Sequence, residues 1–209
     1  MMKTTAPPRF NLFNRAHKAI RALLCNTLLQ VQKTDFTSPD ATGCVAGIRL
    51  SLEVLQEHAY LEDHFIFPLL QSNAPSLAAF FEKQHHQDEL LTQDVEAALT
   101  GFESASGEQE QLLTGIVILE QYAGFVAFNL SHMNMEEQLI NPFLWTLYSD
   151  AELVQRVTEA LQKAPPAHDD LLLRLMIENQ NSRELAAWFA AMGPEATENL
   201  NARLSAAGV

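Results

Sequence analysis

A pattern of histidine, glutamate and proline occurs twice in this chain and restricts its fold more than any other feature. In both copies the glutamate follows the histidine by four positions and the proline follows it by ten. The residues are His58, Glu62 and Pro68 in the first copy and His132, Glu136 and Pro142 in the second. Four residues of an α-helix make roughly one turn, so each histidine shares a helix face with its glutamate. Two such helices can direct two imidazoles and two carboxylates at one point, which predicts a metal site inside a helical bundle.

The composition indicates a folded protein with an acidic surface. The chain has 209 residues, of which 47% are hydrophobic, enough to build a sizeable core. Its formal net charge is −13, and such a surface repels nucleic acids and anionic lipids. No apolar run reaches the length of a membrane span, and residues 1–10 hold no hydrophobic signal region. We therefore expect a cytoplasmic protein that binds neither nucleic acid nor membrane.

Apolar residues recur with helical spacing along nearly the whole chain, and no segment alternates as a β-strand would. We expect long helices at about residues 11–32, 39–71, 77–100 and 106–148, because breaks rich in proline, glycine and serine separate these segments. The sequence thus predicts an all-α fold. An up-down-up-down four-helix bundle at 11–148 is followed by a C-terminal extension of short helices at 149–209 that packs on the bundle.

Local signals mark where two of these helices begin. Ser106 with Gln109, and Ser149 with Glu152, have the spacing of a capping box.

The inward residues of the last two long helices come level only if the third helix runs on through Glu103 or the fourth overhangs the bundle. In the extension, Trp188 and Phe189 are expected to contact the bundle.

Each long helix carries a histidine on its apolar face, and two of the helices add a glutamate one turn later. These inward residues are His17, His58, Glu62, His85, His132 and Glu136. In the third helix His85 lies nearer the apolar stripe, and its neighbour His86, rotated by about 100°, remains a candidate. His64 and His168 are expected to face solvent. Antiparallel packing brings the inward histidines to similar heights.

Two inward glutamates need a compensating charge, because burying an unpaired carboxylate costs several kcal/mol. No lysine or arginine lies on these faces, and a metal ion would remove the cost. Without metal, we expect the two carboxylates to repel each other, so that at least one has a raised pKa.

Tyr122, on the face of His132, is either a site residue or an ordinary core residue, the second being the simpler interpretation. Cys25 and Cys44 are expected to be small buried apolar residues rather than ligands.

The doubled pattern, with Phe67-Pro68 after its first half, resembles the hemerythrin-like HHE cation-binding domain over about residues 11 to 148. The resemblance implies a di-iron centre whose ligands are His17, His58, Glu62, His85 or His86, His132 and Glu136, with both glutamates bridging. Oxygen-carrying hemerythrins have a further histidine one turn after the third-helix ligand, where this chain has Glu89 or Leu90. The chain is more similar to the four-histidine version of nitric-oxide and iron-stress proteins. Glu89 and Glu137 stay open as additional ligands.

Imidazole and carboxylate donors without thiolates favour iron, with manganese or zinc as alternatives. Two six-coordinate ions offer about twelve positions, and the six residues fill about eight, which leaves room for a small ligand. We expect a non-haem di-iron protein that binds dioxygen, nitric oxide or peroxide, or that senses or handles iron. The alternatives are a ferritin-like di-iron oxidase or peroxidase and a metal-free helical interaction module. Binding is favoured over catalysis, because only Tyr122 and Glu89 could act as a general acid near the site. The sequence specifies no oligomeric state.

Overall fold

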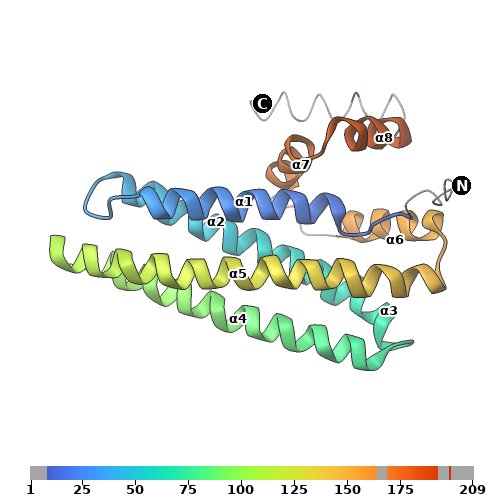
Figure 1. The fold of residues 1–209 in the computed structure, drawn as a ribbon, viewed down its shortest axis with the longest axis horizontal. Helices are drawn as coiled ribbons and strands as arrows, with labels where there is room; N and C mark the ends of the chain where they lie inside the picture. The colour runs from blue at the N-terminus through green and yellow to red at the C-terminus, as the bar shows by residue number, and fades with distance from the viewer. Residues whose placement is uncertain (1–8, 164–168, 193–197, 199–209) are drawn as a thin grey trace, which may run out of the picture.

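Four long antiparallel helices build the molecule. The computed structural model describes residues 9–163, 169–192 and 198, and all regular structure in these residues is helical. The bundle consists of α1 (Asn14–Lys33), α2 (Asp40–Leu61), α4 (Pro75–Glu103) and α5 (Glu108–Leu147). Successive long helices run in opposite directions, and α1 contacts α2 and α5 while α4 contacts α5 and α2 (Figure 1). The predicted all-α bundle is confirmed.

The second long helix is interrupted where the first copy of the pattern lies. A π-helical turn, η1 (Glu62–Ile66), follows α2, and α3 (Phe67–Gln71) completes the segment. The prediction of one regular helix to residue 71 is therefore wrong. Pro68 has no backbone N–H and its ring crowds the carbonyl of the preceding turn, so a widened turn relieves the conflict. Pro142, in the second copy, lies inside a continuous α5.

The long helices end close to where the sequence places them. α4 continues to Glu103, which is the first of the two expected alternatives. The predicted partnership of Ser106 with Gln109 is wrong: both the backbone N–H and the hydroxyl of Ser106 contact Glu110 Oε2, at 2.8 and 3.0 Å. A carboxylate one position further along accepts both bonds and serves the same capping role.

The second predicted capping box is confirmed. Ser149 N and Oγ both donate to Glu152 Oε2, at 2.8 and 2.7 Å, and Glu152 N returns a longer bond to Ser149 Oγ at 3.4 Å. This reciprocal pair satisfies backbone donors at the start of α6 (Asp150–Lys163). The chain therefore turns directly from α5 into α6.

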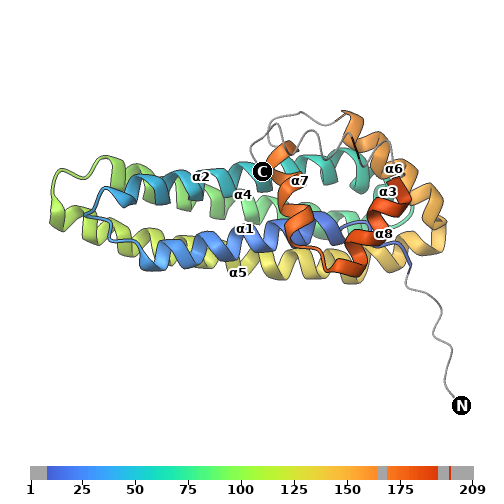
Figure 2. The same ribbon diagram turned by 90° about the horizontal axis from the view of Figure 1, so that it is seen from above.

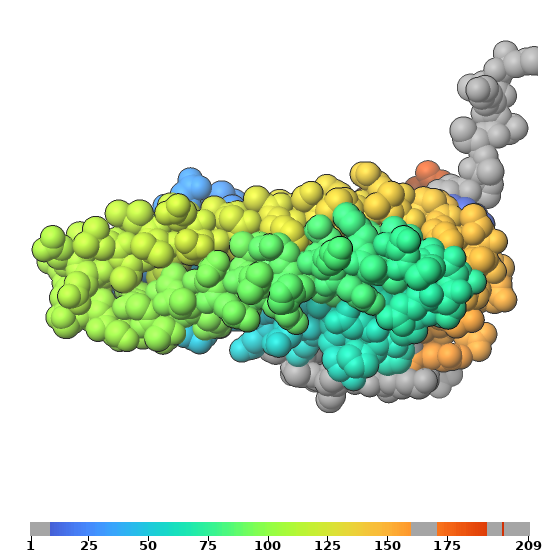
Figure 3. Space-filling view, turned by 90° about the horizontal axis from the view of Figure 1, so that it is seen from below, coloured from blue at the N-terminus to red at the C-terminus, as the bar shows by residue number. Residues whose placement is uncertain are grey.

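The short C-terminal helices lie on one side of the bundle. α7 (Asp169–Glu178) packs against α1, and α8 (Ser182–Met192) lies beside it at the end near α6 (Figure 2). The guanidinium of Arg15 lies 4.6 Å from the ring centroid of Trp188, which ties α8 to α1. Figure 3 shows the opposite face, where α4 and α5 form the surface. α7 and α8 thus cover part of the α1 side of the bundle.

Two apolar clusters fill the core, one on each side of a buried polar layer. The large cluster includes Ile20, Leu24, Ile48, Leu52, Leu99, Ile118 and Tyr122. The small cluster, toward α6, includes Phe13, Phe67, Leu70, Phe81, Ile140, Leu144 and Leu153. Fully burying a side chain of this kind stabilises the fold by about 1.5–3 kcal/mol. The two clusters hold the bundle together around the polar residues between them.

Among the described helices, α5 is long and apolar enough, by length and composition alone, to cross a membrane. The expectation that no segment reaches this limit is therefore wrong. Part of its apolar surface faces the bundle core, whereas Leu113 and Ile116 are 57% and 64% exposed. The same helix carries His132 and Glu136 into the interior. Length and composition are weak grounds for a membrane span when a helix packs in a bundle in this way.

Candidate metal centre

The four inward histidines come from the four long helices and meet between the two apolar clusters. His17 lies in α1, His58 in α2, His85 in α4 and His132 in α5, and all four are buried. His17 lies one helical turn from Phe13 and His85 one turn from Phe81, both of which belong to the small cluster. Antiparallel packing therefore brings the four imidazoles together, as the sequence predicts.

Glu62 and Glu136 complete the cluster. Glu62 is the first residue of η1 and Glu136 lies within α5, and their side chains are 2% and 0% exposed. Two groups of four residues form, with one possible ligand atom of each residue within 4.8 Å of the others. The first group is His17, His58, Glu62 and Glu136; the second is Glu62, His85, His132 and Glu136. Both glutamates belong to both groups, which is the arrangement that two bridged metal ions need.

The individual oxygens divide between the two groups. Glu62 Oε1 lies 3.0 Å from His58 Nε2, and Glu62 Oε2 lies 3.4 Å from His85 Nε2. Glu136 Oε1 lies 3.2 Å from His132 Nε2, and Glu136 Oε2 lies 3.4 Å from His17 Nε2. Each carboxylate thus presents one oxygen to each pair of histidines. This geometry suits bridging coordination, in which one oxygen binds each ion.

Several of these atoms have no hydrogen-bond partner among the described residues. They are Glu62 Oε1, His85 Nε2 and both carboxylate oxygens of Glu136. Buried polar atoms in folded proteins nearly always have a hydrogen-bond partner. A group of potential ligand atoms that lack one and lie close together therefore indicates a missing cation. Imidazole nitrogen with carboxylate oxygen is a donor set that suits iron or manganese. The residues present therefore fit a two-metal site.

Two outer carboxylates orient the rings. His17 Nδ1 lies 3.0 Å from Glu137 Oε1, and His85 Nδ1 lies 2.9 Å from Asp63 Oδ1. A carboxylate at Nδ1 fixes the tautomer and leaves Nε2 directed into the cluster, as in many metal sites. Sequence reasoning did not give either residue this role. The available signal was the acidic residue that directly follows each predicted glutamate ligand.

Electrostatics in the cluster correct the expected behaviour of the carboxylates. Burial raises the pKa of Glu62, but His58, His17 and His85 outweigh it and hold the pKa well below its usual value. Burial lowers the pKa of His17, but Glu137, Glu62 and Glu136 raise it to about 9. His85 shows the same balance with Asp63, Glu136 and Glu62, and its pKa rises to about 12. The expectation that at least one carboxylate has a raised pKa is wrong for Glu62, because the nearby imidazoles lower its pKa more than burial raises it.

Phenylalanine rings surround most of the imidazoles. Phe13 stacks on His17 with ring centroids 4.9 Å apart, and Phe67 lies 4.8 Å from His85. His132 has Phe81 at 5.9 Å and a stacked Phe128 at 6.0 Å. These rings exclude water from the cluster and hold the imidazoles in place.

Three other candidate residues, His86, Glu137 and His64, lie outside the two groups. The side chain of His86 is 71% exposed and contacts Glu89, which is 69% exposed, so the structure brings His85, and not His86, to the second group. Glu137 lies behind His17, where it also accepts bonds from Arg21 and Asn11. His64 is exposed, as predicted, with Nδ1 2.8 Å from the carbonyl oxygen of Tyr60.

The remaining candidates are core or surface residues. Tyr122 is fully buried, and its hydroxyl lies 2.8 Å from Ser51 Oγ, so the ordinary core interpretation is confirmed. Burial raises the pKa of Tyr122 to about 12. Cys44 is buried as expected, whereas Cys25 is exposed, because it lies on the outer face of α1. His168 lies outside the described residues.

Comparison with known proteins agrees with this geometry. The model of the hemerythrin HHE cation binding domain matches residues 10–144. The F-box/LRR-repeat protein 5 of Mus musculus is 22% identical over 148 residues, and that of Pongo abelii is 24% identical over 151 residues. Both alignments cover 70% of this chain but 21% of the relative, so the chain spans about a fifth of the length of these curated relatives.

No solved structure is similar enough to count as a match. The family match nevertheless covers well over half of the chain and includes all six residues of the cluster. It also spans the two copies of the histidine and glutamate pattern. The chain belongs to the hemerythrin HHE cation-binding domain family.

Proposed function

We propose that this protein holds two iron ions in the cluster and uses them to bind a small molecule such as dioxygen, nitric oxide or peroxide, or to sense or handle iron. The observation that carries the proposal is the division of the oxygens of Glu62 and Glu136 between two pairs of histidines. His17 and His58 would hold one ion, and His85 and His132 the other. Bound iron supplies coordination positions that the protein leaves open. Manganese and zinc are the alternatives.

The surroundings of the cluster support binding over catalysis. The two residues considered as general acids do not reach it, since Tyr122 bonds to Ser51 and Glu89 is exposed beside His86. Phe13, Phe67 and Phe81 cover three of the imidazoles. A site with no general acid in contact with it is suited to reversible binding of a small uncharged molecule. A cytoplasmic location is part of this proposal.

A cavity provides access to one side of the cluster. It has a volume of about 610 Å³, and His58 and Glu62 form part of its wall. Of the four imidazoles, that of His58 is therefore the one that this cavity reaches. A small molecule can approach the site by this route.

Metal analysis tests the proposal. Protein reconstituted with ferrous iron and passed through a desalting column should retain about two irons per chain. His58→Ala and His132→Ala should each lower that number sharply, because each removes one ligand of a different ion. His64→Ala is the matched control, since His64 is exposed and outside the cluster. Full iron content in both site variants would show that the cluster does not hold the metal.

Optical spectra test the small-ligand part. The iron-loaded protein should change its near-ultraviolet and visible absorption when nitric oxide or dioxygen is added, and should do so stoichiometrically. Steady consumption of peroxide or ferrous iron over many turnovers would instead favour the oxidase or peroxidase alternative. Protein that takes up no iron, manganese or zinc would favour the metal-free interaction module.

A further inference from the structure

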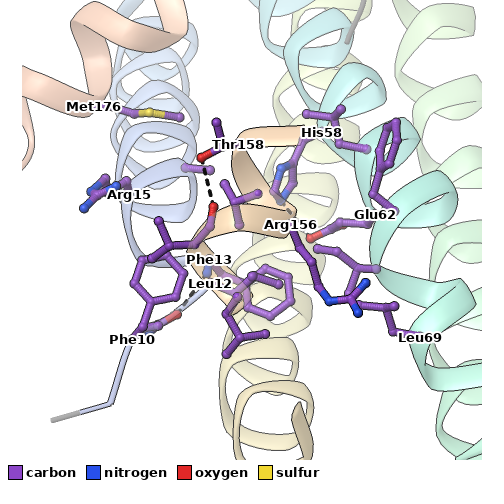
Figure 4. A pocket seen from close by; sticks show the side chains of 18 of the residues that line it. Phe10, Leu12, Phe13, Arg15, His58, Glu62, Leu69, Arg156, Thr158 and Met176 are labelled. Carbon is purple, nitrogen blue, oxygen red and sulfur yellow. Dashed lines mark hydrogen bonds and ion pairs between the residues drawn. The ribbon is translucent and has the colours of Figure 1, made fainter. Parts of the chain in front are cut away.

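The cavity at the α6 end of the bundle is larger than a diatomic molecule requires. Its walls come from the segment before α1, from η1, and from the three C-terminal helices (Figure 4). A volume of about 610 Å³ lies within the range of pockets that enclose an organic ligand of some ten to twenty non-hydrogen atoms. The size points to a second ligand with a carbon skeleton, distinct from the molecule proposed for the metal site.

The lining is mostly apolar. Residues such as Phe10, Leu12, Phe65, Leu69 and Val157 form most of the wall. Contact with such a wall favours a hydrocarbon chain or ring, at about 25 cal/mol for each Å² of apolar surface removed from water. The body of the ligand should therefore be hydrophobic.

The charges on the wall have the opposite balance to the rest of the protein. The whole chain has 26 acidic residues and 13 lysines and arginines. The wall has two arginines, Arg15 and Arg156, and one carboxylate, that of Glu62, which belongs to the metal cluster. An excess of positive charge around an apolar pocket in an acidic protein indicates an anionic ligand.

Both guanidinium groups rest on aromatic rings. Arg15 lies 4.6 Å from the ring centroid of Trp188, and Arg156 lies 4.5 Å from that of Tyr148. Burial lowers the pKa of Arg15, and no ion pair joins it to a carboxylate among the residues whose side chains the structure describes. A partly desolvated arginine gains from a carboxylate partner, with which it can form two parallel hydrogen bonds.

We propose that this pocket binds an amphipathic carboxylate of the medium-chain fatty acid class. The hydrocarbon chain occupies the apolar space between η1 and α6, and the carboxylate pairs with Arg156, while Arg15 lies on the other side of the pocket and adds positive charge (Figure 4). This site goes beyond the proposed metal function. The helices α6, α7 and α8 then supply part of the wall of a ligand pocket.

Calorimetric titration with decanoate and decanol tests the proposal. The two probes share the same chain length but differ in charge. Below its micelle concentration, decanoate should bind the full-length protein saturably, one per chain, and about tenfold more tightly than decanol. The experiment is done on metal-free and on iron-loaded protein, so the result is separate from that of the metal analysis. Absence of saturable binding in both forms, or equal affinity for the two probes, would overturn the proposal.

Three variants locate the site. The double variant Arg15→Gln with Arg156→Gln should reduce decanoate affinity to that of decanol while leaving decanol unaffected. Val157→Trp should weaken both probes, because the larger side chain fills the pocket. Arg49→Gln is the matched control, since Arg49 pairs with Glu96 and Glu103 away from the pocket. If Val157→Trp fails to fold, a second measurement still decides. Decanoate is used to displace the fluorescent apolar anion 8-anilinonaphthalene-1-sulfonate from the unmodified protein and from the arginine variant, and the two affinities are compared. Unchanged decanoate affinity in the arginine variant, or an equal loss in Arg49→Gln, would contradict the assignment.

Discussion

The Nδ1 atom of His17 lies 3.0 Å from Oε1 of Glu137, a residue 120 positions further along the chain. Arg21 and Asn11 donate to the same carboxylate, at 2.8 and 3.0 Å. Burial raises the pKa of Glu137, but these partners lower it to about 2, so the group is ionised at neutral pH. This charged anchor holds His17 with its other nitrogen toward Glu136.

Glu137→Gln should therefore weaken iron binding by about tenfold or more without removing a ligand, because outer carboxylates typically contribute 10–100-fold to metal affinity. Competition with a chelator of known affinity measures the change. Glu89→Gln, at an exposed carboxylate beside His86, is the control and should leave affinity unaltered. Equal affinity in the two variants would mean that Glu137 only braces α1 against α5.

In α4, His85→Ala should lower iron content far more than His86→Ala. His85 is in contact with Glu62 and Asp63, whereas the side chain of His86 is 71% exposed. Iron per chain after desalting is the measurement, with circular dichroism to show that both variants are folded. The opposite order would move the α4 ligand to His86.

The metal-free protein should lose stability as the pH rises from about 6.5 toward 9. The pKa of His17 is raised from 6.5 to about 9 in the fold, so its contribution is complete below 6.5 and is lost as the pH passes through about 9. The pKa of Glu62 is depressed, so its contribution is present above its ordinary value of 4.5 and is lost only as the pH falls well below it. Glu62 therefore stays ionised between pH 6.5 and 9, and the loss of stability in this range comes from the histidines.

Thermal unfolding of chelator-treated protein between pH 6.5 and 9 measures this effect. His17→Gln should make the dependence shallower, since a neutral amide cannot take up the proton, and His85, whose pKa is raised to about 12, should supply the dependence that remains. The iron-loaded protein should behave oppositely and release metal as the pH falls, because protons compete for the histidines. A melting temperature of the metal-free protein that does not change over this window would contradict the assignment of the charge to His17.

Two glycines of α5 should respond in opposite directions to alanine. A Cβ on Gly115 would lie 2.6 Å from Cδ2 and 2.7 Å from Cγ of the Phe36 ring, whereas a Cβ on Gly124 would meet nothing within 4 Å. Gly115→Ala should cost about 1–3 kcal/mol through displacement of Phe36. Gly124→Ala should stabilise the fold by about 0.5–1 kcal/mol, because alanine restricts the unfolded chain. Chemical denaturation measures both, and stabilisation by both would show that Phe36 moves aside freely.

The sequence by itself determined the long helices and the inward face of each. Helical spacing placed His17, His58 and His132 on apolar stripes, and a four-residue separation placed Glu62 and Glu136 beside their histidines. These are local relations, fixed by the 3.6-residue period, so they can be read without knowing how the helices pack. The resemblance to the hemerythrin family depended on the same pattern.

Only the tertiary structure decided what depends on residues distant in the chain. The choice between His85 and His86 depends on how α4 is rotated relative to η1. The π-helical turn that begins at Glu62 depends on the conflict between Pro68 and the helix before it. The charge balance of the buried cluster could not be predicted from the sequence either. No lysine or arginine was visible on the inward faces, yet Glu137 and Glu62 raise the pKa of His17 to about 9, and His17 in turn lowers the pKa of Glu62. Pairing energies of this kind arise from distances across the bundle, which no single helix determines.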